Sequence, residues 1–216
     1  MNEDTLVVFV PVWGSYVKLL TDGLLPSLLQ QGNLPALDLS VRVELVTTGD
    51  HGWVKDVERV LLRSVPRVEV NVTSFPDPSN LVLLGLRHCI KLCRELDCRM
   101  LVGMPDHVYG DEAVANAVAY AEGRNFCVAG AYLRANRSTF KPNWPVSNPQ
   151  LVSLAMEHLH ADNLIQFDMR CVNATFDGGM SLREIRRGMT ACVHHLPNVF
   201  LAAFTEADEE YWDAAV

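Results

Sequence analysis

Short apolar runs rich in β-branched residues alternate with longer helical stripes through the first 133 residues, and this order restricts the fold more than any other feature. The runs that we interpret as strands are Leu6–Pro11, Val41–Thr47, Arg67–Thr73, Arg99–Met104 and Phe126–Leu133. The first of them is apolar throughout, as is typical of a strand that is buried on both faces of a parallel sheet. Strands and helices in alternation predict an α/β fold with a mostly parallel central sheet flanked by helices.

The helical stripes cover residues 16–29, 52–63, 79–97 and 111–122. Pro26 lies inside the first stripe, so we expect the helix to kink or restart there. The regular order ends near residue 136, and the turn-rich stretch 141–149 predicts an excursion or an active-site loop. Two further helices are predicted over residues 149–160 and 181–192. A chain of 216 residues suits one compact domain, residues 1–216.

Charge and hydropathy limit the classes of partner. The 26 acidic residues outnumber 18 basic ones, so the net charge of −8 disfavours non-specific binding to nucleic acid. The apolar run Leu6–Pro11 is far shorter than the roughly 20 residues of a membrane-spanning helix, and the first four residues lack the positive charge of a secretory leader. We therefore expect a cytoplasmic protein with no membrane span.

The six cysteines contain no C-x-x-C pair, and several lie inside apolar helix or strand patterns. Cys89 and Cys93 would share one face of a helix, but no second pair follows to complete the four ligands of a structural zinc. Reduced cysteines that pack in the core are the favoured interpretation.

Ligands of open α/β sheets bind outside the carboxyl ends of the strands, so the four strand exits are the candidate site. These exits are Pro11–Gly14, Thr47–Asp50, Thr73–Asp77 and Pro105–Asp111, and three of the four carry acidic residues. A carboxylate there can bind a hard cation or a ribose hydroxyl, and both suit a nucleotide. Because Asp is also common in ordinary turns, the arrangement carries the signal rather than any single acid.

Several common nucleotide and hydrolase motifs are absent from the sequence. The exit Pro11-Val-Trp-Gly-Ser has one glycine where G-x-G-x-x-G or G-x-x-x-x-G-K-[ST] needs several. There is also no G-x-S-x-G and no H-E-x-x-H. These absences weigh against a classical dehydrogenase, a P-loop NTPase, a serine hydrolase and a zinc protease.

A few other side chains are candidates for ligand contacts. Trp13 could stack on a base or a sugar, although a tryptophan is more often part of a core. Arg134 follows the fifth predicted strand and could face a diphosphate, or form an ordinary surface ion pair. Two histidine pairs, 158/160 and 194/195, could bind a metal or act as bases, or could simply cap and pack.

The chain resembles the nucleotide-sugar glycosyltransferases of the GT-A fold, and more narrowly the small bacterial and phage proteins similar to them. The resemblance is carried by Val7–Gly14, by the Leu25–Leu29 helix with Gly32–Pro35 after it, and by Asn80–Cys98 followed by Arg99–Asp106. It implies a single-domain Rossmann-like GT-A fold. Residues 1–135 would then form the nucleotide-binding core, and residues 136–216 the loops and helices on the acceptor side.

The resemblance also implies roles for particular residues. The nucleoside would be held at Pro11, Val12 and Trp13 and at the turn containing Thr48 and Asp50, with Arg134 toward the diphosphate. Where the family has Asp-x-Asp before its metal, this chain has Met104-Pro-Asp106, so only one carboxylate carries over.

A divalent cation, Mn²⁺ or Mg²⁺, would accordingly be held by Asp106, with His107, Asp111 or His194 completing its ligands. The candidates for the base that activates the acceptor are Asp111, Asp168 and His194.

The activity that follows from the resemblance is transfer of a sugar from a nucleoside diphosphate sugar, first of all a UDP-sugar, to an acceptor hydroxyl. The acceptor is left open among a glycan, a small molecule, a protein and a modified nucleic-acid base, and a homo-oligomer is also left open. Two alternatives remain. One is another nucleotide-dependent transferase of the nucleotidyltransferase type, and the other is a non-catalytic binding protein on a degenerate GT-A fold.

Overall fold

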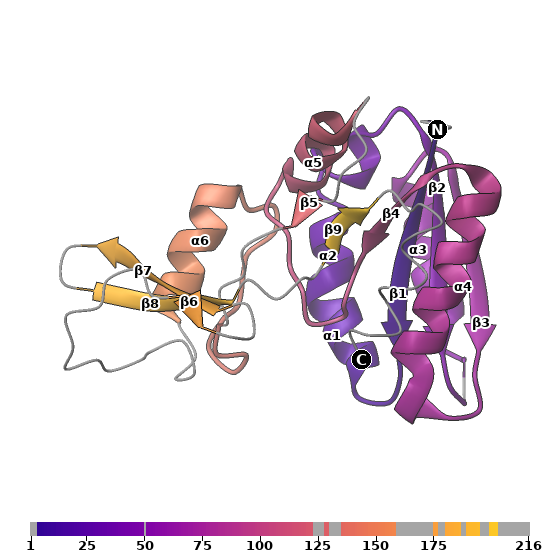
Figure 1. Ribbon diagram of the computed structural model, residues 1–216, viewed down its shortest axis with the longest axis horizontal. Coiled ribbons are helices and arrows are strands. Elements are labelled where there is room, and N and C mark those ends of the chain that lie inside the picture. Colours follow the sequence, from indigo (N-terminus) through magenta and orange to yellow (C-terminus); the bar gives the residue numbers. More distant parts are fainter. Residues whose placement is uncertain are drawn as a thin grey trace.

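A computed structural model describes residues 4–49, 51–122, 128–129, 135–158, 175–176, 180–186, 189–194 and 199–202 (Figure 1). Side chains are described within 4–49, 51–122 and 135–158. Figure 1 shows a sheet covered by helices and, beside it, a smaller lobe that contains α6 and three short strands.

A six-stranded sheet, in the order β3-β2-β1-β4-β9-β5, forms the centre of the described structure. Its strands are β1 (Thr5–Val12), β2 (Ser40–Thr47), β3 (Val68–Ser74), β4 (Arg99–Val102), β5 (Val128–Ala129) and β9 (Val199–Ala202). The first four are parallel neighbours, and β9 is antiparallel to both β4 and β5. The predicted α/β fold with a mostly parallel sheet is confirmed.

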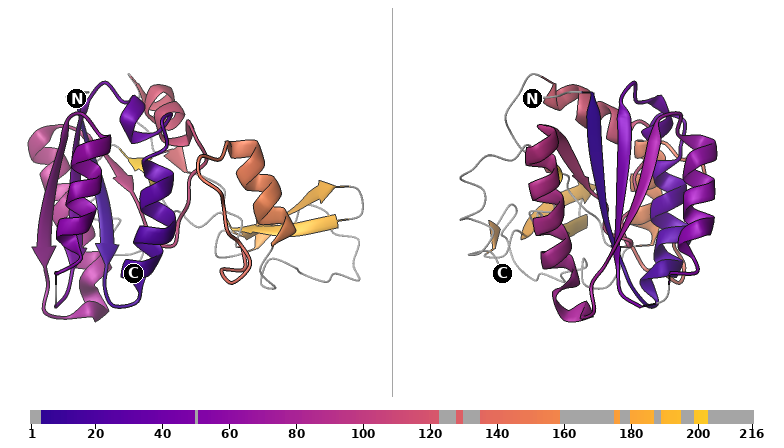
Figure 2. Two further views of the ribbon diagram at one scale, coloured as in Figure 1. Left: turned by 180° about the vertical axis from the view of Figure 1, so that it is seen from behind. Right: turned by 90° about the vertical axis from the view of Figure 1, so that its right-hand side faces the viewer.

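Two hydrophobic cores lie on the two faces of this sheet because successive side chains of β1 point in opposite directions. Leu6, Val8 and Val10 belong to one core, and Val7 and Phe9 belong to the other. The first core is covered by three helical segments: α1 (Tyr16–Leu19) through α2 (Leu25–Leu28), α3 (Val54–Ser64) and α5 (Ala113–Ala121). The second is covered by α4 (Leu81–Leu96), and Figure 2 shows α4 on the face opposite to α1–α3.

Gly85 allows α4 to approach the sheet closely. A Cβ atom built on this glycine would lie 2.7 Å from Val46 Cγ1 and 2.9 Å from Phe9 Cε2. These separations are shorter than any normal carbon contact, so a larger residue would push the helix away from β1 and β2.

The first helical stripe stays helical from Tyr16 to Leu28, but its hydrogen-bond pattern changes just before Pro26, where we expected a kink or a restart. Between α1 and α2 the chain forms a π-helical turn, η1 (Leu20–Leu24), and Pro26 lies in the first turn of α2. Proline lacks the N–H that would bond the carbonyl four residues earlier, and that carbonyl, of Asp22, lies within the π-helical turn. Short 3₁₀ turns, η2 (Leu34–Ala36) and η3 (Pro78–Asn80), precede β2 and α4.

The smaller lobe contains α6 (Asn148–Glu157) and the three-stranded sheet β6 (Thr175–Phe176), β7 (Met180–Arg186) and β8 (Met189–His194). The predicted helix at 149–160 is therefore confirmed over most of its length, whereas the helix predicted at 181–192 is wrong. That stretch forms an antiparallel pair in which Met180 faces His194 and Arg186 faces Met189. Short segments of mixed polar and apolar residues fit either periodicity, and here cross-strand pairing decided the outcome.

Within the described residues, we find no helix that is long and apolar enough to cross a membrane.

Candidate functional site

The β1 and β4 exits flank the topological switch point of the sheet. The connection after β1 leads to β2 on one side, and β4 lies on the other side, with β9 and β5 beyond it. Phe9 pairs with Val102, and the Gly103 amide donates to the Phe9 carbonyl at 2.8 Å, so the two exits leave the sheet side by side. Open α/β sheets hold their ligands at this position. We call residues 11–16, 47–49, 51 and 103–107 the carboxyl edge.

An aromatic pair stands at the β1 exit. The ring centroids of Trp13 and Tyr16 are 4.6 Å apart, with the rings inclined by 38°. Gly14 makes the turn between them with φ of +51°, which a glycine adopts at no steric cost. Both aromatic side chains are half-buried, whereas Pro11 and Val12, which we also predicted as nucleoside contacts, lie with their side chains in the core. The pair therefore offers the accessible ring surface at this exit.

The β2 exit contributes a histidine that the sequence analysis missed. Thr48 is half-buried, Gly49 has φ of +69°, and Asp50 lies outside the described residues. His51 follows, and its carbonyl accepts a hydrogen bond from the Val54 amide at 3.0 Å. Its Nδ1 atom is buried and has no hydrogen-bond partner among the described residues. The signal that could have found it is its place directly after the Thr47–Asp50 exit.

The β4 exit places Asp106 and His107 in contrasting surroundings. The His107 amide donates to the Met104 carbonyl at 2.9 Å, closing a turn that leaves the Asp106 side chain exposed. The His107 side chain is only partly exposed. Burial lowers its pKa because it disfavours the charged imidazolium, and the Asp106 carboxylate opposes this shift. Asp106 is thus the acid at this exit that a ligand can reach.

Lysines lie near the β1 exit. Lys18 Nζ lies 2.6 Å from Asp22 Oδ2, and both side chains are exposed. The hydrogen bond from Lys18 and, more weakly, the charge of Lys141 hold the pKa of Asp22 below its usual value. Lys141 therefore lies close enough to this ion pair to interact with it, although it is far away in the sequence.

Asp111, which we predicted as a base, lies away from the carboxyl edge. Its Oδ1 atom accepts a hydrogen bond from the Gly32 amide at 2.8 Å, and its own amide donates to the Val146 carbonyl at 2.8 Å. The helical segment 16–28 starts at the carboxyl edge and leads back toward the start of β2, so Gly32 lies near the opposite edge of the sheet. The structure does not bring this predicted base together with Asp106.

Buried amide side chains surround that contact. Gln30 Nε2 donates to the Tyr109 carbonyl at 2.8 Å, and its Oε1 accepts from the Val146 amide at 2.5 Å. Asn33 Nδ2 donates to the carbonyls of Ser27 at 2.8 Å and Gly110 at 3.0 Å, and its Oδ1 accepts from the Val114 amide at 2.9 Å. We call Gln30, Gly32, Asn33 and Asp111 with these partners the α2–α5 junction.

The other predicted site residues cannot be placed with this edge. Asp168 and Arg134 lie outside the described residues. The backbone of His194 ends β8, which belongs to the three-stranded sheet rather than to the sheet of β1 and β4, and its side chain is not described.

Metal ligands at the edge are few. In the part of the chain that the structure describes, no three side chains of His, Cys, Asp or Glu come together as a metal site. Mg²⁺ commonly uses one or two protein carboxylates and takes its remaining ligands from phosphate and water. The exposed carboxylate of Asp106 fits that pattern, but the described residues do not fit a cation held by protein alone.

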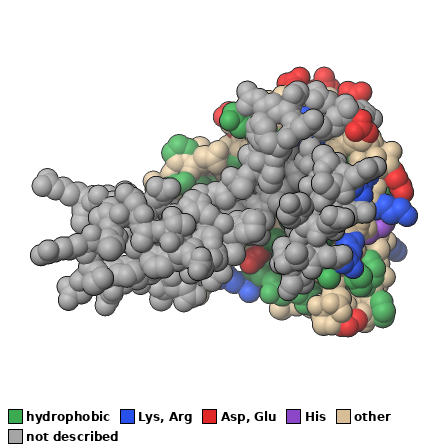
Figure 3. All heavy atoms as spheres, viewed as in Figure 1, with side chains coloured by type: hydrophobic (Ala, Val, Ile, Leu, Met, Phe, Trp, Pro, Cys, Tyr) green, Lys and Arg blue, Asp and Glu red, His purple; other side chains and the backbone are tan. Residues whose placement is uncertain are grey.

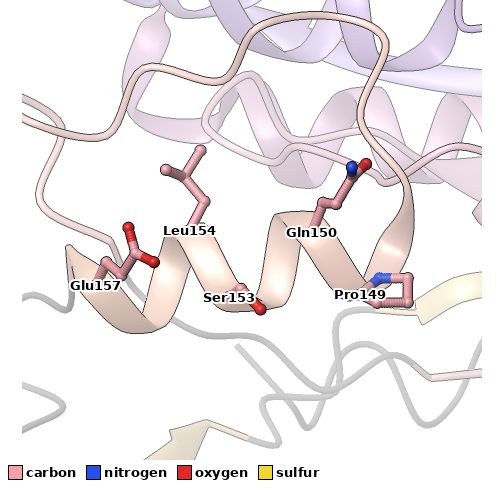
Figure 4. A pocket seen from close by; sticks show the side chains of 5 residues that line it. All are labelled: Pro149, Gln150, Ser153, Leu154 and Glu157. Atoms are coloured by element: carbon pink, nitrogen blue, oxygen red, sulfur yellow. The ribbon is translucent and has the colours of Figure 1, made fainter.

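The surface offers two further observations. In the space-filling view, hydrophobic side chains gather at the lower end of the sheet, where β1 and β3 end (Figures 1 and 3). A shallow pocket of about 320 Å³ lies along α6, and its described lining residues are Pro149, Gln150, Ser153, Leu154 and Glu157 (Figure 4). None of them belongs to the carboxyl edge.

Comparisons with known proteins give a weak likeness at the level of structure. No family model matches the chain, and no curated protein sequence matches it. One similar solved structure is described as a crystal structure of 4-diphosphocytidyl-2C-methyl-D-erythritol synthase. It shares 14% sequence identity at a TM-score of 0.43, and the match covers 99% of this chain and 85% of that one. We therefore base the function on the residues of this chain.

Proposed function

We propose that the protein is a glycosyltransferase that binds a nucleoside diphosphate sugar at the carboxyl edge and transfers the sugar to an acceptor hydroxyl. One observation carries this proposal. The Trp13–Tyr16 pair and the exposed carboxylate of Asp106 leave adjacent strands at the switch point of a parallel sheet. An aromatic surface beside an acid suits the two unlike ends of a nucleotide, because the ring can stack on the base and the acid can hold a cation for the phosphates.

The base would stack on the aromatic pair. A base stacked on an aromatic side chain is worth about 1–3 kcal/mol, and a half-buried Trp13 keeps ring surface free for it. His51 Nδ1 gives this region a polar contact, since a buried nitrogen without a partner gains free energy from a hydrogen bond with a ribose hydroxyl or a base edge. These contacts would orient the nucleoside.

The diphosphate needs positive charge, and Asp106 by itself would repel it. A Mn²⁺ or Mg²⁺ ion held by Asp106 and by phosphate oxygens would remove this repulsion. Such a cation, when bound, offsets the negative charge that develops on the leaving diphosphate. Lys18 and Lys141 are the described cations near the β1 exit, and both can reach toward the same charge.

The acceptor and its base are not assigned to particular atoms. Of the three predicted bases, Asp111 is committed to Gly32 at the α2–α5 junction, and the side chains of Asp168 and His194 lie outside the described ones. The acceptor class accordingly stays open among glycans, small molecules, proteins and modified bases.

Nucleotidyl transfer is the second candidate, because the same sheet edge can hold a nucleoside triphosphate. Such an enzyme needs a glycine-rich, basic loop after the first strand to receive the triphosphate. Here the stretch from Trp13 to Lys18 supplies only one glycine and one lysine. We therefore place sugar transfer first.

Thermal unfolding in the presence of ligands tests both candidates. UDP, GDP, CDP, their sugars, and UTP and CTP are compared, each with and without Mn²⁺. A ligand at 100 times its Kd adds about 2.7 kcal/mol to the free energy of unfolding. We expect one nucleoside diphosphate and its sugar to stabilise the protein, and Trp13→Ala to weaken that binding by about 10- to 100-fold.

Matched variants make the result specific to the edge. Tyr120→Ala removes an exposed aromatic ring on α5 and is expected to leave binding unchanged. Asp106→Ala is expected to abolish the part of the stabilisation that depends on Mn²⁺. Stabilisation by the triphosphates alone would indicate nucleotidyl transfer, and no stabilisation at millimolar nucleotide would indicate the non-catalytic binding protein.

A further inference from the structure

Two buried cysteines meet where α4 ends, independently of the carboxyl edge. Asp97 caps the helix with φ of +52°, and the Cys98 amide donates to the Cys93 carbonyl at 2.9 Å. The Asp97 amide also donates to the Arg94 carbonyl at 3.3 Å. Together these two bonds form a Schellman motif, in which the residue after the left-handed one packs against the residue five positions before it. In this chain, both members of that contact are cysteines.

The two thiols are not equivalent. The side chains of Cys93 and Cys98 are joined by a hydrogen bond, and the Cys98 sulfur also receives one from the backbone of Val7. These donors lower the pKa of Cys98, whereas the same hydrogen bond, together with burial, raises the pKa of Cys93. Cys98 is therefore the better nucleophile and Cys93 the thiol beside it.

We propose that Cys93 and Cys98 form a reversible oxidation site, at which a hydroperoxide converts the two thiols to a disulfide. The Cys98 thiolate attacks one peroxide oxygen, which forms a sulfenic acid as the O–O bond breaks and the other oxygen leaves, with a proton, as water or an alcohol. Cys93 then attacks the Cys98 sulfur, loses its proton and releases the sulfenic oxygen as water. The two thiols lose two electrons and two protons in total, and the peroxide gains them.

Cys89 lies one turn earlier on α4 and is not part of this pair. It is fully buried, and burial raises its pKa, so its thiolate is disfavoured. All three cysteines are reduced in the structure. Because Cys93 and Cys98 are only 2% and 4% exposed, we expect a small hydroperoxide to reach them more readily than a bulky alkylating reagent.

The sequence makes the product easy to recognise. Trypsin cleaves after Lys91, Arg94 and Arg99, so Cys93 and Cys98 fall in separate peptides. The full-length protein is treated with hydrogen peroxide, alkylated in denaturant and digested. The expected product is peptide 92–94 joined to peptide 95–99, with the mass of the two peptides less two hydrogen atoms, and dithiothreitol should separate them.

Other outcomes overturn the proposal. Recovery of both peptides in alkylated form after peroxide treatment would show that the pair does not oxidise. Cys98 recovered as a sulfinic acid, or a disulfide that includes Cys89, would show that the contact does not direct the chemistry.

Cysteine variants supply the controls. Cys89→Ser should keep the joined peptides, and Cys98→Ser should lose them, with circular dichroism as the check on folding. Peptide mapping of the peroxide-treated protein without substitutions decides the question even where a variant folds poorly. Loss of the joined peptides in Cys89→Ser, with its circular dichroism unchanged, would contradict the assignment.

Discussion

Asp106 and Asp111 stand five residues apart in one segment, yet the structure gives them opposite surroundings. Asp106 is exposed at the carboxyl edge, beside the β1 exit. Asp111 is partly buried at the α2–α5 junction, where its carboxylate accepts a hydrogen bond from the Gly32 amide and its own amide donates to the Val146 carbonyl. An acid whose hydrogen bonds are already used supports the fold, while an exposed acid at a strand exit is available to a ligand.

The same contrast extends to the two regions as a whole. At the junction, Gln30 and Asn33 are buried, and each has its amide donor and its carbonyl acceptor matched to backbone groups. At the carboxyl edge, His51 Nδ1 is buried without a partner among the described residues. Polar groups in the first region therefore stabilise the native state, whereas His51 Nδ1 in the second stays ready for binding.

The largest expected effect is that of Asn33→Ala. It removes one hydrogen bond from the Ser27 carbonyl, and it leaves the Gly110 carbonyl and the Val114 amide without their side-chain partner inside the protein. We expect the free energy of unfolding to fall by about 3–5 kcal/mol, measured by urea denaturation. A loss below about 1 kcal/mol would show that water replaces these bonds and that the junction is not a closed network.

A paired comparison of the two acids sharpens the contrast directly. Asp111→Ala removes the acceptor of the Gly32 amide and should cost about 1–2 kcal/mol of stability without changing nucleotide affinity. Asp106→Ala should change stability by less than about 0.5 kcal/mol, because its side chain is exposed, and should change nucleotide affinity instead. Urea denaturation and calorimetric titration with nucleotide give the two readouts. If Asp111→Ala instead lowered nucleotide affinity and Asp106→Ala lowered stability, the roles that we assign to the two acids would be reversed.

His107 predicts a dependence of stability on pH. Burial lowers its pKa in the folded state below the value of 6.5 that an unperturbed histidine has. Between these two values the unfolded chain binds more protons, so stability is complete above pH 6.5 and falls as the pH drops below it. His107→Gln should flatten this decline in urea denaturation at a series of pH values. Parallel profiles for the two proteins would contradict the prediction.

The smallest expected effect on stability is that of Lys18→Met. The Lys18–Asp22 ion pair is exposed on both sides, so its loss should change the free energy of unfolding by less than about 0.5 kcal/mol. If Lys18 faces the diphosphate, the same variant lowers nucleotide affinity and makes binding less sensitive to salt. Unchanged affinity in a calorimetric titration would remove Lys18 from the site.

Part of the candidate site could be predicted because strand exits follow from the strands themselves. Recognition of β1 and β4 as buried strands was enough to bring Trp13 and Asp106 to one edge. The same reasoning could not assign Asp111, since the contact with Gly32 joins residues 79 positions apart and leaves no local pattern. His51 was missed for a similar reason, because burial of its Nδ1 atom depends on its neighbours in space.

Local sequence patterns were enough to predict the alternation of strands and helices, the two-sided burial of β1 and the irregular helix near Pro26. These features depend on side-chain periodicity and on backbone chemistry that each residue carries with it. Three other features depend on contacts between separate segments: β7 pairs antiparallel with β8, β9 enters the sheet beside β4, and Cys98 packs against Cys93. Strand pairing and burial determine these features. The free energy that they contribute is gained only when segments that are distant in the sequence come into contact.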